Sequence, residues 1–155
     1  MVILEHPSPN YDERGRTIDM VVLHYTGMQS AAAARDRLCD PAAKVSAHYL
    51  VDEDGTVIRL VAEARRAWHA GVSFWQGATD INARSIGIEI VNPGHEFGYR
   101  PFPATQMAAV ERLLAEMLAR HEIAPARVVG HSDVAPSRKQ DPGELFDWQR
   151  LAARG

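Results

Sequence analysis

The sequence predicts one α/β domain in which a central mixed β-sheet has helices packed on its faces. The chain has 155 residues, 46% of them hydrophobic and 24% charged, which is enough apolar material for one sizeable core. Residues 18–25 are a short, nearly continuous and β-branched apolar run, as in a strand covered on both faces, and residues 85–91 predict another strand that is buried on at least one face. Residues 107–118 instead repeat apolar side chains at helical spacing, and strands alternating with helices predict a layered fold.

Turn and capping residues divide the chain into elements. Ser30 can cap a helix of alanines, and Asp54-Gly55 favours the positive φ of a tight hairpin turn. Thr105 and Asp147 are placed to cap the longest helix and a short final one. The expected elements are an arm or loop at 1–17, a strand at 18–25, a helix ending at Leu38, a hairpin of 47–51 and 56–61, strands at 85–91 and 127–130, and loops at 62–83, 92–104 and 132–146. We therefore expect an N-terminal arm at 1–17 and one domain at 18–155.

Composition excludes several classes of function. The net charge is −3 and the lysines and arginines are scattered, so nothing predicts binding to nucleic acid or to a membrane surface. No run of about 20 apolar residues is present, so no membrane-spanning helix is expected. Cys39 is the single cysteine, which fits a small buried side chain and excludes an intrachain disulfide.

The N-terminus predicts a cytoplasmic location. It lacks the basic segment and the longer apolar core of a secretory signal peptide. A chain trimmed of its export signal would look the same, so a periplasmic or extracellular location stays open.

Two histidines and one aspartate occupy positions that suit a metal site. His24 lies near the end of the first strand, and His131 directly follows the strand at 127–130. Asp141 comes ten residues after His131, in a loop rich in Pro and Gly that can fold back. Two imidazoles and a carboxylate are a catalytic zinc set, with a fourth position open for water. The alternative is that His24 is a hydrogen-bonded core histidine and Asp141 a turn residue.

Glu89 and Lys139 are candidates for the chemistry beside such a metal. Glu89 interrupts an apolar strand, where a carboxylate must be paired, protonated or directed into a polar cleft. A partly desolvated Glu with a raised pKa suits a general base, whereas a salt-bridged or solvent-facing strand residue is the alternative. Lys139 precedes Asp141 by two residues, so in an extended loop it could stabilise an oxyanion beside the metal. A solvated loop lysine is the alternative reading of Lys139.

Aromatic and histidine side chains elsewhere suggest a substrate surface. Trp68 and His69 lie in a loop, where they could form a platform for a sugar or peptide, or a lid over the core. His48 alternates with Tyr49 in a strand, which favours a place behind the ligands or in the core over a ligand role.

Five segments, met in order along residues 18–148, carry a resemblance to a known family. They are VVLHYTG (21–27), VSAHYLVDEDGTV (45–57), RAWHAGVS (66–73), NARSIGIEIVN (82–92) and VVGHSDVAPSRKQDPGELFDW (128–148). The chain resembles the zinc-dependent N-acetylmuramoyl-L-alanine amidases of the type-2 family, which includes small phage amidases and animal peptidoglycan-recognition proteins. The resemblance implies the α/β fold of that family for this chain.

The resemblance also assigns roles residue by residue. It implies one zinc ion held by His24, His131 and Asp141, with Glu89 as catalytic base and Lys139 beside the metal. Animal and phage members commonly have Cys as third ligand and some have Tyr beside the cleft histidine; Asp141 and Ala47 stand there in this chain, which points to the bacterial branch. The residues implied to contact substrate or line its cleft are Trp68, His69, Asn82, Lys44, Arg138 and, behind them, His48.

These residues imply a hydrolase that cleaves the amide between N-acetylmuramic acid, or its 1,6-anhydro form, and L-alanine. We expect it to act on muropeptides in cell-wall recycling, without an obligate protein partner. An exported or phage lytic amidase that acts on intact peptidoglycan is the alternative. A second alternative is a non-catalytic module that binds peptidoglycan. A third is a structural domain whose histidines have no catalytic role.

Overall fold

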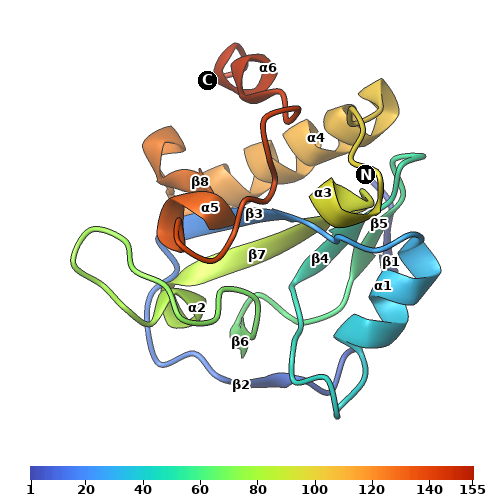
Figure 1. The fold of residues 1–155 in the computed structure, drawn as a ribbon. Helices are drawn as coiled ribbons and strands as arrows, with labels where there is room; N and C mark the ends of the chain where they lie inside the picture. The colour runs from blue at the N-terminus through green and yellow to red at the C-terminus, as the bar shows by residue number, and fades with distance from the viewer.

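A six-stranded mixed sheet forms the centre of the molecule. The computed structural model describes residues 1–155 (Figure 1). The sheet order is β1-β5-β4-β7-β3-β8, in which β4, β7, β3 and β8 are parallel and β5 runs against β4. The strands are β1 (Ile3–Glu5), β3 (Met20–Tyr25), β4 (Tyr49–Val51), β5 (Val57–Arg59), β7 (Ser85–Ile90) and β8 (Val128–Gly130), and a separate pair joins β2 (Tyr11–Glu13) to β6 (Arg65–Ala67). The α/β architecture with a central mixed sheet agrees with the sequence-based expectation.

Helices cover both faces of this sheet. They are α1 (Ala31–Leu38), α2 (Ile81–Arg84), α3 (Gly94–Phe97), α4 (Ala104–His121), α5 (His131–Val134), α6 (Trp148–Ala152) and the 3-10 helix η1 (Pro125–Arg127). The long helix α4 packs on one face, whereas α1, α2 and α5 contribute to apolar clusters on the other (Figure 1). None of these helices has the length and apolar character needed to cross a membrane.

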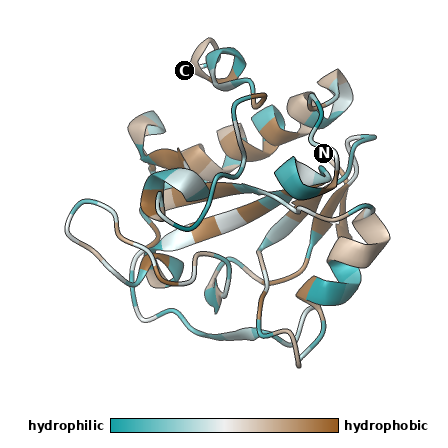
Figure 2. Ribbon diagram, in the orientation of Figure 1, coloured by the Kyte–Doolittle hydropathy of each residue, from teal (hydrophilic) through white to brown (hydrophobic).

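Strand β7 alternates strictly between two environments. Successive strand residues point to opposite faces, so every second side chain of β7 shares one face. The residues directed to the α4 side are Ile86, Ile88 and Ile90, all completely buried in the main core. Ser85, Gly87 and Glu89 therefore share the opposite face. Figure 2 shows brown, apolar residues concentrated on the central strands and on α4. Glu89 therefore lies on the face opposite the isoleucines of the main core.

Several expected caps and turns are confirmed. Ser30 accepts a hydrogen bond from the backbone N–H of Ala33 at the start of α1, and Asp147 does the same for α6. The β4–β5 hairpin turns at Gly55, whose φ of 89° favours glycine. The expected Thr105 cap is wrong: α4 begins at Ala104, and the Thr105 hydroxyl donates to the Glu53 carbonyl instead.

Segments expected to be irregular contain short elements. Residues 1–17 supply β1 and β2, and residues 62–83 supply β6 and α2. The loop expected at 92–104 contains α3, and α5 extends into the loop expected at 132–146. These elements span three or four residues and their strand partners lie far away in the chain, so local periodicity cannot reveal them.

The N-terminal arm is bound to the domain through Arg14. Its buried guanidinium donates to the backbone carbonyls of Glu63, Arg65, Asn82, Ala83 and Ser85. The side chain thereby joins the arm to β6, α2 and the start of β7. The arm therefore packs as part of the domain, and a boundary at residue 17 stays a prediction.

The carboxylate of Glu63 ties the β5–β6 connection to the end of α4. It accepts hydrogen bonds from the hydroxyl of Tyr49 and from the side chains of Arg120 and His121. Burial acts to raise the pKa of Glu63, but these hydrogen bonds outweigh it and lower that pKa from 4.5 to about 2.

Replacing Glu63 by Gln should lower the free energy of unfolding by about 1–3 kcal/mol near neutral pH, because it removes the charge-assisted hydrogen bonds. A lowered folded-state pKa stabilises the fold above the unfolded value, so the deficit should shrink as the pH falls from 4.5 toward about 2. Urea denaturation of both proteins across that range measures the difference. A deficit that stays constant with pH would contradict this role for the carboxylate.

Candidate metal centre and active site

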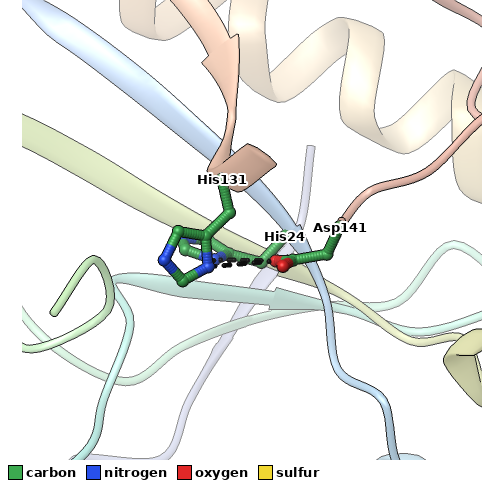
Figure 3. Close-up of side chains that lie close together, drawn as sticks. All are labelled: His24, His131 and Asp141. Carbon is green, nitrogen blue, oxygen red and sulfur yellow. Dashed lines mark hydrogen bonds and ion pairs between the residues drawn. The ribbon is translucent and has the colours of Figure 1, made fainter. Parts of the chain in front are cut away.

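Three side chains from separate parts of the chain meet at the carboxyl ends of β3 and β8. His24 is near the end of β3, and His131 begins α5 directly after β8, the neighbour of β3 in the sheet. The Nδ1 atoms of His24 and His131 are 3.0 Å apart, and they lie 3.1 and 3.2 Å from Oδ2 of Asp141. Figure 3 shows the two imidazoles and the carboxylate pointing toward one another.

The loop that carries Asp141 is fixed by backbone hydrogen bonds on both sides. The Asp141 carbonyl accepts from the N–H of Ser132, which places the loop against the start of α5. The next carbonyl, that of Pro142, accepts from the hydroxyl of Tyr99 at 2.7 Å. The loop therefore folds back toward His131, as its Pro and Gly content suggested.

The protonation states of this cluster suit metal ligands. Burial lowers the pKa of His24 to about 4, although the neighbouring carboxylate of Asp141 opposes the shift. Burial acts to raise the pKa of Asp141, but the adjacent imidazoles of His131 and His24 outweigh it and hold that pKa well below its ordinary value. At neutral pH, His24 is a neutral imidazole and Asp141 a carboxylate, which are the forms that bind metals.

The spacing of the cluster also fits a metal ion. A tetrahedral zinc with ligand distances of about 2.0–2.1 Å separates its ligand atoms by about 3.3 Å. The separations of 3.0–3.2 Å among the three atoms are close to that edge length. His24, His131 and Asp141 are all buried and form a group that could hold a metal ion.

A cleft of about 370 Å³ opens over these three residues. Glu89 lines it from β7, where the strand register places this residue opposite His24. Its Oε2 atom is buried without a hydrogen-bond partner in the protein. Burial, and then the negative charge of Asp141, raise the pKa of Glu89 well above 4.5. Lys139 is exposed and lines the same cleft from the Asp141 loop.

The residues expected to contact substrate lie in different surroundings. Trp68 is partly buried and lines the cleft. Arg138 also lines it, but its Nε and one terminal nitrogen donate to the carbonyls of Val72 and Ala70. Lys44 is exposed and is not among the residues that line the cleft.

Neither Asn82 nor His48 is among the residues that line the cleft, which corrects the substrate contact expected for Asn82. The complete burial of His48 agrees with the place behind the ligands or in the core expected for it, and not with a direct substrate contact. The Asn82 side-chain oxygen accepts from the N–H groups of His69 and Ala70 and supports that segment from behind. His48 is completely buried, where its Nδ1 accepts from the N–H of Gly87. Both side chains satisfy backbone groups brought close only by folding, which the sequence does not reveal.

His69 is buried at the floor of the cleft and contacts a metal-ligand candidate. Its Nδ1 lies 3.0 Å from Nε2 of His24, and its Nε2 lies 3.1 Å from the hydroxyl oxygen of Ser85. Sequence reasoning missed Ser85, which the alternating pattern of β7 could have placed on the same face as Glu89.

Comparison with known proteins places this site in context. The N-acetylmuramoyl-L-alanine amidase family model matches residues 14–144. The chain is 40% identical to the N-acetylmuramoyl-L-alanine amidase AmiD of Escherichia coli K12, over 89% of this chain and 53% of AmiD. It is 37% identical to the 1,6-anhydro-N-acetylmuramyl-L-alanine amidase AmpD of the same strain, over 94% of this chain and 87% of AmpD.

A solved structure shows the same fold. The chain is similar, with a TM-score of 0.82 and 38% identity, to E. coli AmiD in complex with anhydro-N-acetylmuramic acid-L-Ala-D-γ-Glu-L-Lys. That similarity covers 97% of this chain and 61% of the AmiD chain. The chain thus spans only about half to three fifths of the length of AmiD. From the family model, these identities and the shared fold, the chain belongs to the N-acetylmuramoyl-L-alanine amidase family.

Proposed function

We propose that this protein is a zinc-dependent amidase that releases L-alanyl peptides from 1,6-anhydro-N-acetylmuramic acid. The observation that carries the proposal is the triangle of His24, His131 and Asp141 at the floor of a cleft that Glu89 also lines. Support comes from AmpD, whose name gives the 1,6-anhydro substrate, and from AmiD, which was solved with an anhydro-muropeptide. A non-catalytic binding module would have no need for Glu89 beside a complete set of ligands.

The mechanism follows from where the polar groups lie. His24, His131 and Asp141 would hold the zinc ion, which when bound polarises the amide carbonyl and makes water more acidic. Glu89 accepts a proton from the attacking water and returns it to the alanine nitrogen as the C–N bond breaks. Lys139 places its ammonium beside the oxygen that gains negative charge and stabilises it.

Side chains at the cleft rim would orient the muropeptide. The partly buried ring of Trp68 offers an apolar face for the sugar or the peptide. Arg138 keeps one terminal nitrogen free of the loop carbonyls, and we assign that nitrogen to a stem-peptide carboxylate. Exposed Lys44 directly precedes Val45 and Ser46, which line the cleft, and we assign it to a carboxylate of the stem peptide.

We further propose a role in recycling soluble cell-wall fragments in the cytoplasm. A lytic amidase that acts on intact peptidoglycan outside the cytoplasm is the competing function. The two differ in the substrate they prefer, because a recycling enzyme acts on small soluble fragments. Cell fractionation with an antibody to the native protein tests the compartment separately from the chemistry.

The substrate test compares two materials under one set of conditions. The zinc-loaded protein should release L-alanyl peptide from soluble anhydro-muropeptide much faster than from intact sacculi, as measured by chromatography. A chelator should abolish release and added zinc should restore it. Faster digestion of sacculi would favour the lytic alternative, and binding of either material without cleavage would favour the non-catalytic module.

Replacing Asp141 by Ala should remove a ligand and lower zinc affinity by more than about 100-fold, with activity lost in parallel. Asp133→Ala is the matched control, because Asp133 lies in the same region but accepts only from the N–H of Gly130. The control should keep its zinc and lose about 1 kcal/mol of stability. Full zinc occupancy in the Asp141 variant, measured by metal analysis, would refute the ligand assignment.

Replacing Glu89 by Gln should lower turnover by about 10²–10⁴-fold with zinc retained, because the base is lost and the ligands remain. Burial raises the pKa of Glu89 above 4.5. As the pH is lowered, wild-type activity should therefore be lost at a higher pH than it would be with a glutamate of ordinary pKa. The variant should lack that acid limb in its pH–rate profile. Glu96→Gln, at another carboxylate lining the cleft, should leave the profile unchanged. An unaltered rate in the Glu89 variant would remove this residue from the mechanism.

A further inference from the structure

The consecutive residues His69 and Ala70 contact the Nε2 atoms of the two candidate histidine ligands, which are the ring nitrogens that do not face Asp141. Nε2 of His24 lies 3.0 Å from Nδ1 of His69, and Nε2 of His131 lies 2.9 Å from the carbonyl oxygen of Ala70. Asn82 accepts from the N–H groups of both His69 and Ala70, so this segment is itself held in place. One pair of consecutive residues therefore contacts both imidazoles on the side away from Asp141, His69 through its ring and Ala70 through its backbone carbonyl.

The direction of the hydrogen bond between His24 and His69 can be derived by starting from Ile81. This residue is the last in a series of contacts that runs from His24 through His69 and Ser85. The carbonyl of Ile81 can only accept, so the Ser85 hydroxyl donates to it at 2.7 Å. The Ser85 oxygen then accepts from Nε2–H of His69, whose Nδ1 is left as an acceptor. That acceptor receives Nε2–H of His24. Nδ1 of His24 consequently carries a lone pair.

The same conclusion holds for the second histidine. The carbonyl of Ala70 can only accept, so His131 donates from Nε2 and its Nδ1 also carries a lone pair. Two nitrogen lone pairs and the carboxylate of Asp141 thus face one another at 3.0–3.2 Å. Three acceptors so close repel one another unless a cation lies among them. The outer hydrogen bonds therefore direct the lone pairs that a metal ion needs.

The fold makes room for His69 at one position of β7. A Cβ atom on Gly87 would lie only 2.4 Å from Cγ of the His69 ring. The ring packs over the glycine, between Ser85 and Glu89 on the same face of the strand. Only glycine at position 87 leaves room for the imidazole of His69, which contacts His24.

We propose that His69 is a positioning residue, which fixes the tautomer and ring orientation of His24 through a His24–His69–Ser85–Ile81 hydrogen-bond chain. This inference rests on the proposed metal site and replaces the substrate contact expected for His69. Ala70 does the same for His131 through its carbonyl. Outer partners of this kind raise metal affinity by about 10- to 100-fold, because the ligand is held in its binding form before the metal arrives.

The test measures zinc affinity and the visible spectrum of the cobalt-substituted protein. His69→Ala should weaken zinc binding by about 10- to 100-fold and alter the cobalt absorption bands. His69→Asn should recover part of the affinity, because its side-chain oxygen can accept from His24 at the position of Nδ1. A merely structural role would give no recovery with Asn and no change in the cobalt spectrum.

His48→Asn is the matched control for loss of a buried imidazole. His48 is at least as buried as His69, but it has no hydrogen bond to either ligand. Its replacement should lower the melting temperature and leave zinc affinity and the cobalt spectrum unchanged. If it weakened zinc binding as much as His69→Ala does, the positioning role would be overturned.

Gly87→Ala supplies an independent test, because it displaces the His69 ring without removing it. The variant should weaken zinc binding to a similar extent as His69→Ala. In the double variant the methyl group fills the space left by the ring, so no further loss is expected. Additive losses in the double variant would overturn the proposal.

The outcomes separate this inference from the proposed function. A wild-type protein that binds no zinc overturns both, and one that binds zinc but releases no peptide overturns the amidase alone. Wild-type zinc binding and hydrolysis, together with unchanged zinc affinity in His69→Ala, would overturn only the positioning role.

Discussion

The parallel register of β3 with its two neighbours is the constraint on which the site depends. It places His24 opposite Glu89, and it pairs Leu23 with Gly130, so that His131 follows one residue later. A slip of one residue in β7 would turn Glu89 into the core and an isoleucine into the cleft. The buried isoleucines of β7 oppose that slip, since burial of each contributes about 1.5–3 kcal/mol. Apolar packing on one face of the sheet therefore fixes the polar chemistry on the other.

The parts of the site at strand ends could be predicted from the sequence. His24 and His131 close short apolar runs, and parallel strands bring such ends to one edge of a sheet. Glu89 was conspicuous because a carboxylate in an apolar strand needs a polar environment. The alternation of Ile with Ser, Gly and Glu in residues 85–90 describes a strand with two different faces, so its carboxylate and its isoleucines occupy different environments.

The parts that depend on long-range hydrogen bonds could not be predicted. His48, His69 and Asn82 lie in three separate segments of the resemblance, and none of their hydrogen-bond partners is a neighbour in the chain. Their partners are backbone or imidazole groups 12–45 residues away, so their roles follow only from the folded structure. The short strand β2 within the arm could not be predicted for the same reason, since it pairs with β6, and Arg14 binds carbonyls as distant as that of Ser85. Local pattern carries no information about such contacts.

The partner of His24 is a neutral side chain, His69, and this limits the negative charge of the proposed metal site. Ligating histidines often donate to a carboxylate, but His24 donates to a neutral imidazole. Asp141 already supplies one carboxylate to the proposed ligand set, and Glu89 lines the same cleft, so a divalent cation held there would be balanced by these two groups. A third carboxylate in place of His69 would leave a buried charge without compensation, which costs several kcal/mol. The imidazole donates its Nε2–H to the hydroxyl oxygen of Ser85 and keeps its proton, so it fixes the tautomer of His24 without adding charge.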